Sequence, residues 1–173
     1  MDERRETKDK RLNWYCLHWA REQTFFEDNE RILAVRKCSE PTFTYVDMPA
    51  YVMMSFNVIK SDRINMKYLT GLLNSSLIKY WLKNKGKMQG SMYQVDKEPL
   101  LDLPIYQHSN ATALAELVEK IIFNKKQGLL TNDLEEKIDV LVSRYYDLDY
   151  NEFKVVTPYS LIAKDAYDNY VLN

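Results

Sequence analysis

Lysines recur along one short stretch of the chain at a spacing that suits contact with phosphates. They are Lys79, Lys83, Lys85 and Lys87. Ammonium groups gathered in this way neutralise the phosphates of a nucleic acid and release its counterions. The alternative interpretation is the solvated last turn of a helix, where the negative end of the helix dipole favours cations. The residue types leave both interpretations open.

A polar turn with two glycines, at residues 86–93, follows Lys85 and includes Lys87. Gln89, Ser91 and Tyr93 carry groups suited to base edges or phosphates. The glycines beside them allow a backbone to approach a ligand closely. A flexible polar surface turn without any ligand explains the same residues equally well.

Two further cations, Arg36 and Lys37, stand at the end of a predicted strand, from which they can reach a groove of DNA. An ordinary hairpin rim is the equal alternative. Thr42 and Tyr45 are weaker candidates for such contact. The tryptophans are interpreted as core anchors rather than plates for stacking bases, because large aromatic side chains dominate the cores of small domains. They are Trp14, Trp19 and Trp81.

The familiar signatures of catalysis are missing from the chain. Its four glycines form neither a GxGxxG pattern nor a phosphate-binding loop of the Walker type. Its two cysteines and two histidines lack the spacing of a zinc site. The sequence therefore predicts no catalytic residue, no cofactor-binding residue and no metal ligand.

The net charge of −1 differs from that of a general nucleic-acid coat, which is clearly basic. The charge is unevenly distributed, however, since residues 1–100 sum to +4 and residues 101–173 to −5. Eight basic residues against two acidic ones fall within residues 60–97, so an electrostatic footprint for phosphate is expected there. The acidic C-terminal part is interpreted as a support or docking element.

The 173 residues, 46% hydrophobic and 28% charged, have the composition of a folded globular protein with one domain, or one domain and a small helical appendage. No apolar run reaches the roughly 18 residues that a membrane span needs, and no signal-peptide core follows the charged start. A cytoplasmic protein without membrane contact is expected. Cys16 and Cys38 lack CxxC spacing, which favours two reduced thiols.

Segments rich in β-branched and aromatic residues predict a small mixed or antiparallel sheet. They span residues 31–36, 43–46 and 51–59, with a further strand expected at 93–95. Asn65 is the predicted N-cap of a helix over residues 66–73, and Ser75 or Ser76 that of a second helix ending near Lys85.

Two longer helices are predicted downstream. Apolar residues at helical spacing indicate one helix that begins near Leu114 and stops at Gly128. Asn132 and Glu135 resemble a capping box that opens the next. The tail from residue 157 onward is only weakly helical. These elements predict the α+β class, with short helices beside the sheet and a C-terminal helical hairpin.

Between Trp14 and Ile105 the chain resembles the TaqI-like C-terminal specificity domain, which occurs in adenine-N6 DNA methyltransferases and in type IIG restriction-modification enzymes. The matching stretches follow the family's order. The most specific are the leucine-rich run Asn65 to Ser75, the glycine turn within Lys83 to Gly90 and the segment Lys97 to Ile105. The helical hairpin that follows is similar to the C-terminal extension of such proteins.

The resemblance implies sequence-specific recognition of double-stranded DNA, while a catalytic domain on the opposite side flips out the target adenine. That domain, in the same protein or in a partner subunit, is expected to bind S-adenosylmethionine. The present chain lacks the N/D-P-P-Y motif that holds the target base, so no catalysis is expected from it alone. The alternative is a protein-interaction module that docks a partner through its C-terminal amphipathic helices.

The chain is expected to divide into three parts. They are a linker or disordered entry at residues 1–12, a DNA target-recognition domain at 13–108 and a helical extension at 109–173. The DNA-binding residues expected in the second part are Arg36, Lys37, Lys79, Lys83, Lys85, Lys87, Gln89, Ser91 and Tyr93.

Overall fold

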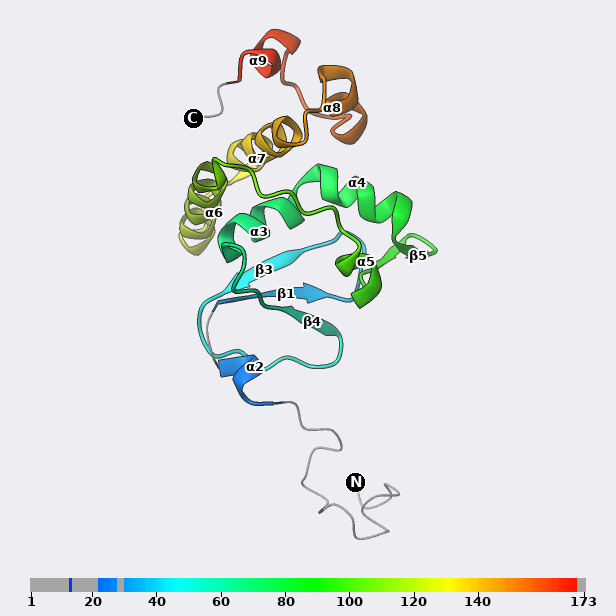
Figure 1. The fold of residues 1–173 in the computed structure, drawn as a ribbon, viewed down its shortest axis with the longest axis vertical. Helices are drawn as coiled ribbons and strands as arrows, with labels where there is room; N and C mark the ends of the chain where they lie inside the picture. The colour runs from blue at the N-terminus through cyan, green and yellow to red at the C-terminus, as the bar shows by residue number, and fades with distance from the viewer. Residues whose placement is uncertain (1–12, 14–21, 28–29, 171–173) are drawn as a thin grey trace.

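The computed structural model describes residue 13, residues 22–27 and residues 30–170. In these parts a layer of strands is covered by α3 and α4, and further helices stack above them (Figure 1). The predictions made for residues 1–12, for Trp14 and Trp19 and for Cys16 lie outside the described residues.

The described strands form two antiparallel sheets of three strands each. The β1 sheet has the order β3-β1-β4 and consists of β1 (Arg31–Val35), β3 (Phe43–Val46) and β4 (Phe56–Ile59). The β6 sheet has the order β2-β6-β5 and consists of β2 (Lys37–Cys38), β5 (Lys87–Gln89) and β6 (Met92–Gln94). These sheets, together with the helices, confirm the predicted α+β class.

Burial explains where the strands of the β1 sheet begin and end. Ile32 and Ala34, two residues apart in β1, are almost fully buried in one cluster with Leu69 of α3. The strand predicted from residue 51 begins only at Phe56. The preceding stretch does not pair, because side chains such as Met54, which is 80% exposed, have no core to face.

Helices precede, separate and follow these strands along the chain. Within the described residues they are α2 (Thr24–Glu27), α3 (Met66–Asn74), α4 (Ser76–Lys85), α5 (Lys97–Leu101), α6 (Ala111–Lys126), α7 (Asn132–Tyr145), α8 (Tyr150–Val156) and α9 (Lys164–Asp168). The α3 and α4 helices begin where the sequence predicts. The Asn65 side chain accepts hydrogen bonds from two backbone N–H groups of the first turn, and Ser75 caps α4.

The α3 helix lies between the β1 sheet and the α6–α7 hairpin (Figure 1). Its residues Leu69 and Leu73 belong to the cluster that also contains Ile32 and Ala34 of the β1 sheet. Its residues Tyr68 and Leu72 are fully buried in a second cluster with Leu114 of α6. The apolar stripes of the predicted helical hairpin are therefore buried within the protein itself.

Tyrosine hydroxyls hold the segment between α5 and α6, which joins the strand-bearing part of the chain to the α6–α7 hairpin. The hydroxyl of Tyr146 donates to the carbonyl oxygen of Pro104 at 2.7 Å, and that of Tyr68 donates to the carbonyl oxygen of Tyr106 at 2.6 Å. The helical hairpin is thus held to the strand-bearing part by hydrogen bonds as well as by packing.

The predicted capping box at Asn132 and Glu135 is wrong. The N-cap of α7 is Thr131, which makes no side-chain capping bond, and its hydroxyl instead donates to the Glu135 carboxylate at 2.7 Å. A capping box does occur at Asp149 and Glu152, where it opens α8. Each of these side chains accepts a backbone N–H of the other residue, as this motif requires.

The tail predicted to be weakly helical holds α9. Tyr167 of α9 stacks on Phe153 of α8 with ring centroids 4.6 Å apart, and both rings pack with Val140 of α7. This small cluster fixes the C-terminal helices to the hairpin. No helix in the described part of the chain is long and apolar enough to cross a membrane.

Candidate nucleic-acid interface

The N-terminal end of α4 is fixed to neighbouring elements. The carboxylate of Asp139 in α7 accepts hydrogen bonds from the backbone N–H of Ser76, at 2.6 Å, and from its hydroxyl, at 2.7 Å. Burial raises the pKa of this carboxyl group. Lys79, in the first turn of α4, forms an ion pair with Glu40 at 2.5 Å. The one lysine at this end of the helix therefore has its partner within the protein.

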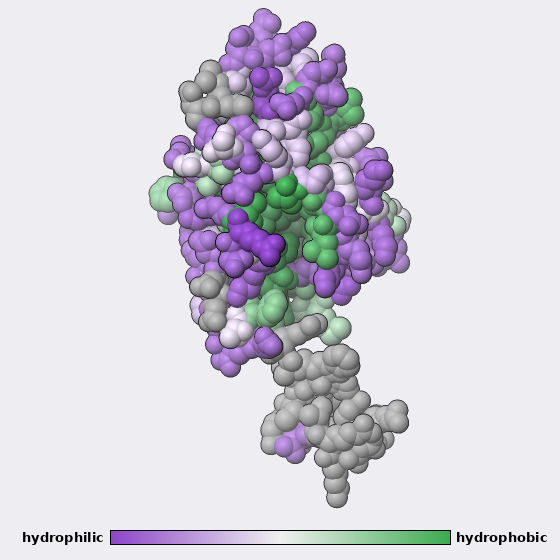
Figure 2. Space-filling view, viewed as in Figure 1, coloured by the Kyte–Doolittle hydropathy of each residue, from purple (hydrophilic) through white to green (hydrophobic). Residues whose placement is uncertain are grey.

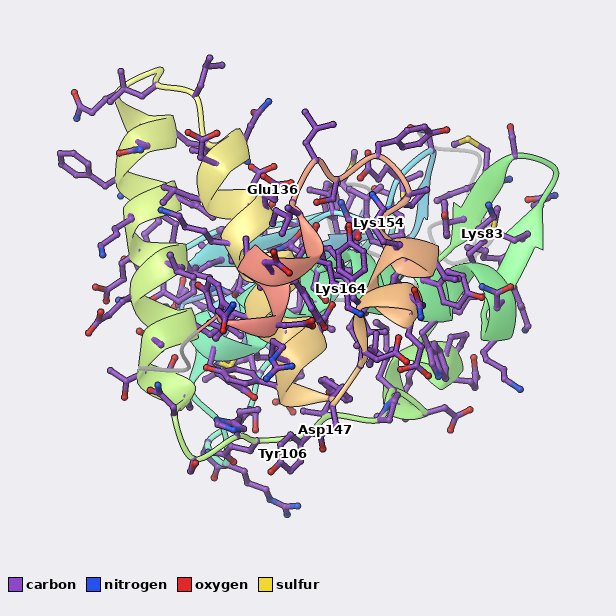
Figure 3. All side chains as sticks on the ribbon, turned by 90° about the horizontal axis from the view of Figure 1, so that it is seen from above. Lys83, Tyr106, Glu136, Asp147, Lys154 and Lys164 are labelled. Carbon is purple, nitrogen blue, oxygen red and sulfur yellow. The ribbon has the colours of Figure 1, made fainter. Side chains whose placement is uncertain are left out.

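The C-terminal end of α4 is arranged differently. Lys83 and Lys85 are exposed in its last turn, and neither forms an ion pair with another described residue. Lys83 lies beside the β5–β6 hairpin, at the edge of the molecule far from the α6–α7 hairpin (Figure 3). Gly86 then turns the chain into β5. A Cβ atom there would lie 2.4 Å from the carbonyl oxygen of Leu82, so the turn requires glycine.

The segment predicted as a flexible turn is mostly a β-hairpin, because residues 87–89 pair with β6. Gly90 and Ser91 connect Gln89 to Met92, which lie directly opposite each other. Gly90 has a φ of 62°, and glycine in the first position of a two-residue connection is typical of a type II′ turn. Gln89 and Ser91 are exposed at the tip.

The register of the β6 sheet places Lys37 and Lys87 on either side of Gln94. Residues opposite each other share a face of a sheet, and neighbours along a strand alternate between faces. This gives one face a defined set of side chains. The cationic face consists of Lys37, Lys87, Gln89, Met92 and Gln94.

The opposite face of the β6 sheet belongs to the core. Cys38 and Tyr93 share this face. Both are partly buried and pack against the hydrophobic cluster shared by the β1 sheet and α3. The cationic face is consequently turned away from that core. Lys37 and Lys87 are exposed and form no ion pair within the described parts of the chain.

Arg36 stands where β1 of one sheet leads into β2 of the other. Its guanidinium donates to the carboxylate of Asp96, with Nη2 3.0 Å from Oδ1. The second oxygen of Asp96 accepts from the side-chain amide of Gln94 at 2.5 Å. The hydrogen bond from Arg36 lowers the pKa of Asp96, so this carboxylate is ionised at neutral pH.

The structure separates the predicted contact residues into three groups. Those with exposed polar groups, on the cationic face, at the hairpin tip, in the last turn of α4 or beside Asp96, are Arg36, Lys37, Lys83, Lys85, Lys87, Gln89 and Ser91. Lys79 is apart from them in its ion pair with Glu40, and the ring of Tyr93 packs on the core side. Gln94 and Asp96 were missed, since isolated polar residues at the end of a strand carry no distinctive sequence signal.

The remaining weaker candidates have partners elsewhere. The hydroxyl of Thr42 donates to the carbonyl oxygen of Glu40 at 3.3 Å. The hydroxyl of Tyr45 donates to the Glu30 carboxylate at 2.5 Å. Trp81 is partly buried and packs against the hydrophobic cluster shared by the β1 sheet and α3, as expected of a core side chain.

Two hollows occur away from the cationic face. The larger, of about 590 Å³, lies between β3, α3, α6 and α7 and is lined by charges of both signs, among them Lys125 and Glu135, which pair at 2.9 Å. The smaller, of about 360 Å³, is mainly apolar and lies over β4, α3 and α5, where green side chains surround a depression (Figure 2). No group of three or more His, Cys, Asp or Glu side chains among the described residues is placed to hold a metal ion.

A small α+β domain with unpaired lysines around a short sheet is suited to binding a polyanion. Comparison with known proteins identifies the family. The sequence matches the TaqI-like C-terminal specificity domain over residues 3–105, and the chain belongs to this family.

Two similar proteins come from Haemophilus influenzae. The chain is 24% identical to Type II methyltransferase M.HincII, in a match that covers 73% of this chain and 29% of the relative. It is also 24% identical to Type II methyltransferase M.HindII of strain ATCC 51907 / DSM 11121 / KW20 / Rd, with 73% and 28% covered. The matched region thus spans less than a third of the length of either relative.

Proposed function

We propose that the chain is the target-recognition domain of a site-specific adenine-N6 DNA methyltransferase or of a type IIG restriction-modification enzyme. It binds double-stranded DNA and does not catalyse methyl transfer itself. A separate catalytic domain, in the same protein or in a partner subunit, binds S-adenosylmethionine and flips out the target adenine. The family and the names of both relatives support a role within a methyltransferase. Cellular DNA as the substrate implies a cytoplasmic location.

The observation that carries the proposal is the cross-strand row of Lys37, Gln94 and Lys87. Neighbouring strands are about 4.8 Å apart, so lysines separated by one strand stand about 10 Å apart at their backbones. The β5–β6 hairpin of this sheet is a two-stranded ribbon, and such a ribbon fits the major groove of DNA, which is about 12 Å wide. In this arrangement the two lysines contact phosphates at the rims of the groove, while Gln89 and Ser91 at the hairpin tip approach base edges.

The rival function, a module that docks a partner through its C-terminal amphipathic helices, is less well supported. Leu114, Val118 and Leu141 of these helices are buried in the cluster with α3, so the predicted docking stripes already have a partner. Exposed apolar side chains do gather near the α6–α7 connection. They are Phe123, Leu129 and Leu130. They favour a protein contact at that end, which is compatible with DNA binding at the other.

Duplex binding measured as a function of salt tests the proposal. Fluorescence anisotropy with a random-sequence duplex is expected to give a plot of log affinity against log salt with a slope of about −3 to −4. That slope corresponds to four phosphate contacts at about 0.9 each. Absence of binding at low salt, or binding that salt does not weaken, would contradict the proposal.

A further inference from the structure

Asp96 is held between the side chains of Arg36 and Gln94. One of its carboxylate oxygens lies 3.0 Å from Nη2 of Arg36, and the other lies 2.5 Å from Nε2 of Gln94. The side chain of Asp96 is 12% exposed, whereas that of Arg36 is 45% exposed. The acceptor is thus fixed inside the protein, and the donors that it orients reach solvent.

Asp96 occupies a position where aspartate normally has another task. It is the N-cap residue of α5, yet its side chain makes no capping hydrogen bond. An aspartate at an N-cap ordinarily accepts a backbone N–H of the first turn. Here the carboxylate turns instead to Arg36 and Gln94, so the protein forgoes a capping bond to order these two side chains.

The backbone beneath Arg36 is fixed as well. Its N–H donates to the carbonyl oxygen of Ser55 at 2.9 Å, and its carbonyl oxygen accepts from the N–H of Val95 at 2.7 Å. Nη1 of the guanidinium reaches the carbonyl oxygen of Met54 at 3.4 Å. Two of the five N–H donors of Arg36 are therefore engaged, and three remain for a ligand.

We infer that Asp96 is a positioning residue that presents Arg36 to the edge of a guanine in duplex DNA. The inference rests on the proposed function and deepens it, because it specifies a guanine within the recognised site. An arginine fork matches the O6 and N7 acceptors of guanine in the major groove. Gln94 keeps its carbonyl oxygen and one N–H, the combination that recognises adenine.

The charge of the Arg36–Asp96 pair distinguishes base recognition from phosphate binding. A phosphate brought to Arg36 would also approach the Asp96 carboxylate, and the two anions would repel each other. A base edge carries donors and acceptors without net charge, so the carboxylate repels it far less than it repels a phosphate. The unpaired Lys37 and Lys87 on the adjoining cationic face suit phosphates, and Arg36 suits a base.

Selection of binding sites from randomised duplexes by the 173-residue chain, at about 50 mM salt, tests the inference. The wild type is expected to prefer guanine at one position. Arg36→Lys keeps the cation but loses the fork, so it should reduce that preference by roughly 5- to 150-fold. Its affinity for random DNA should change by less than about twofold.

Asp96→Asn should change the base preference and the affinity for random-sequence DNA in opposite directions. It should relax the same base position, because Arg36 is no longer held. It should also raise affinity for random DNA by about two- to fivefold, because the positive charge of Arg36 is no longer compensated. A merely structural role for Asp96 would weaken binding to all sequences together.

Glu40→Gln is the matched control, since it removes a carboxylate from the ion pair with Lys79, away from the cationic face. It should leave the base preferences unchanged. A wild type without any base preference, or an Arg36→Lys variant with an unaltered profile, would overturn the inference alone. A wild-type chain that binds no duplex would overturn both the inference and the proposed function.

Discussion

The two ends of α4 carry lysines in opposite circumstances. At the start, Lys79 is paired with Glu40, and the Asp139 carboxylate fixes the first turn. At the end, Lys83 and Lys85 extend into solvent without an ion pair to any other residue that the structure describes. Identical side chains on one helix therefore serve the fold at one end and are available to a ligand at the other.

This difference shows that the partner, rather than the residue type, separates structural cations from candidate ligand-binding ones. Lys67 and Lys125 also pair with glutamates, at 2.5 and 2.9 Å. A lysine already neutralised by a carboxylate gains less from a phosphate than a free one does. The comparison thus supports the proposal that the end of α4 and the cationic face contact DNA.

The largest effect is expected from Gln89→Ala, at the tip of the hairpin. If Gln89 contacts a base, its loss should cost about 1 to 3 kcal/mol against the preferred site and almost nothing against random DNA. Binding selection from randomised duplexes should show relaxed preference at one position. Gln127→Ala, an exposed glutamine just past α6, is the control. Equal loss at every position would contradict base recognition by Gln89.

The fixed end of α4 should matter for stability instead of binding. Asp139→Ala leaves the N–H and hydroxyl of Ser76 without their acceptor, which should cost about 1 to 3 kcal/mol in the free energy of unfolding. Denaturant unfolding measures this loss. DNA affinity measured below the unfolding transition should stay within about twofold of the wild type, and a larger fall would show that the two ends are not independent.

A smaller, pH-dependent effect is expected from Asp139→Asn. Burial raises the pKa of Asp139 in the folded state, so its protonated form is the more stable one there. The stability gained in this way is fully present below the unfolded pKa of about 3.9 and is lost as the pH rises through the folded pKa. The free energy of unfolding of the wild type should therefore rise relative to that of Asp139→Asn as the pH falls from 7 toward 4. A difference that stays constant with pH would contradict burial as the cause.

No effect at all is expected from S-adenosylmethionine. The glycines of the chain form no cofactor-binding loop, and no N/D-P-P-Y motif is present. Isothermal titration calorimetry of the chain with the cofactor should show no binding heat, and DNA should remain unmethylated. A stoichiometric heat with micromolar affinity would place methyl-transfer chemistry in this chain.

Long elements with a strong pattern are predictable from this sequence. The capping side chain of Asn65 and the apolar spacing beyond Leu114 locate α3 and α6 closely. The β6 sheet was only partly predicted, because strands of two or three residues are too short to show a period. Its pairing of Lys37 with Gln94, fifty-seven residues away, depends on tertiary structure.

The candidate site was likewise predictable in composition but not in arrangement. Residue types alone placed Lys79 with the other lysines of its cluster, since nothing in the local sequence reveals its pairing with Glu40. They also placed Tyr93 among the contact residues, although the alternation of β6 turns its ring to the core side. Asp96 was missed because its role depends on Arg36, sixty residues earlier in the chain.

The most direct test of the account compares two double variants in one salt titration with a random-sequence duplex. Lys85→Ala with Lys87→Ala removes two unpaired lysines, and Lys79→Ala with Lys125→Ala removes two paired ones. The first variant should make the slope of log affinity against log salt shallower by about 1 to 2 units. The second should leave the slope within about 0.5 of the wild type. Equal slopes for both variants, or a larger change in the second, would contradict the assignment of the DNA-contacting region.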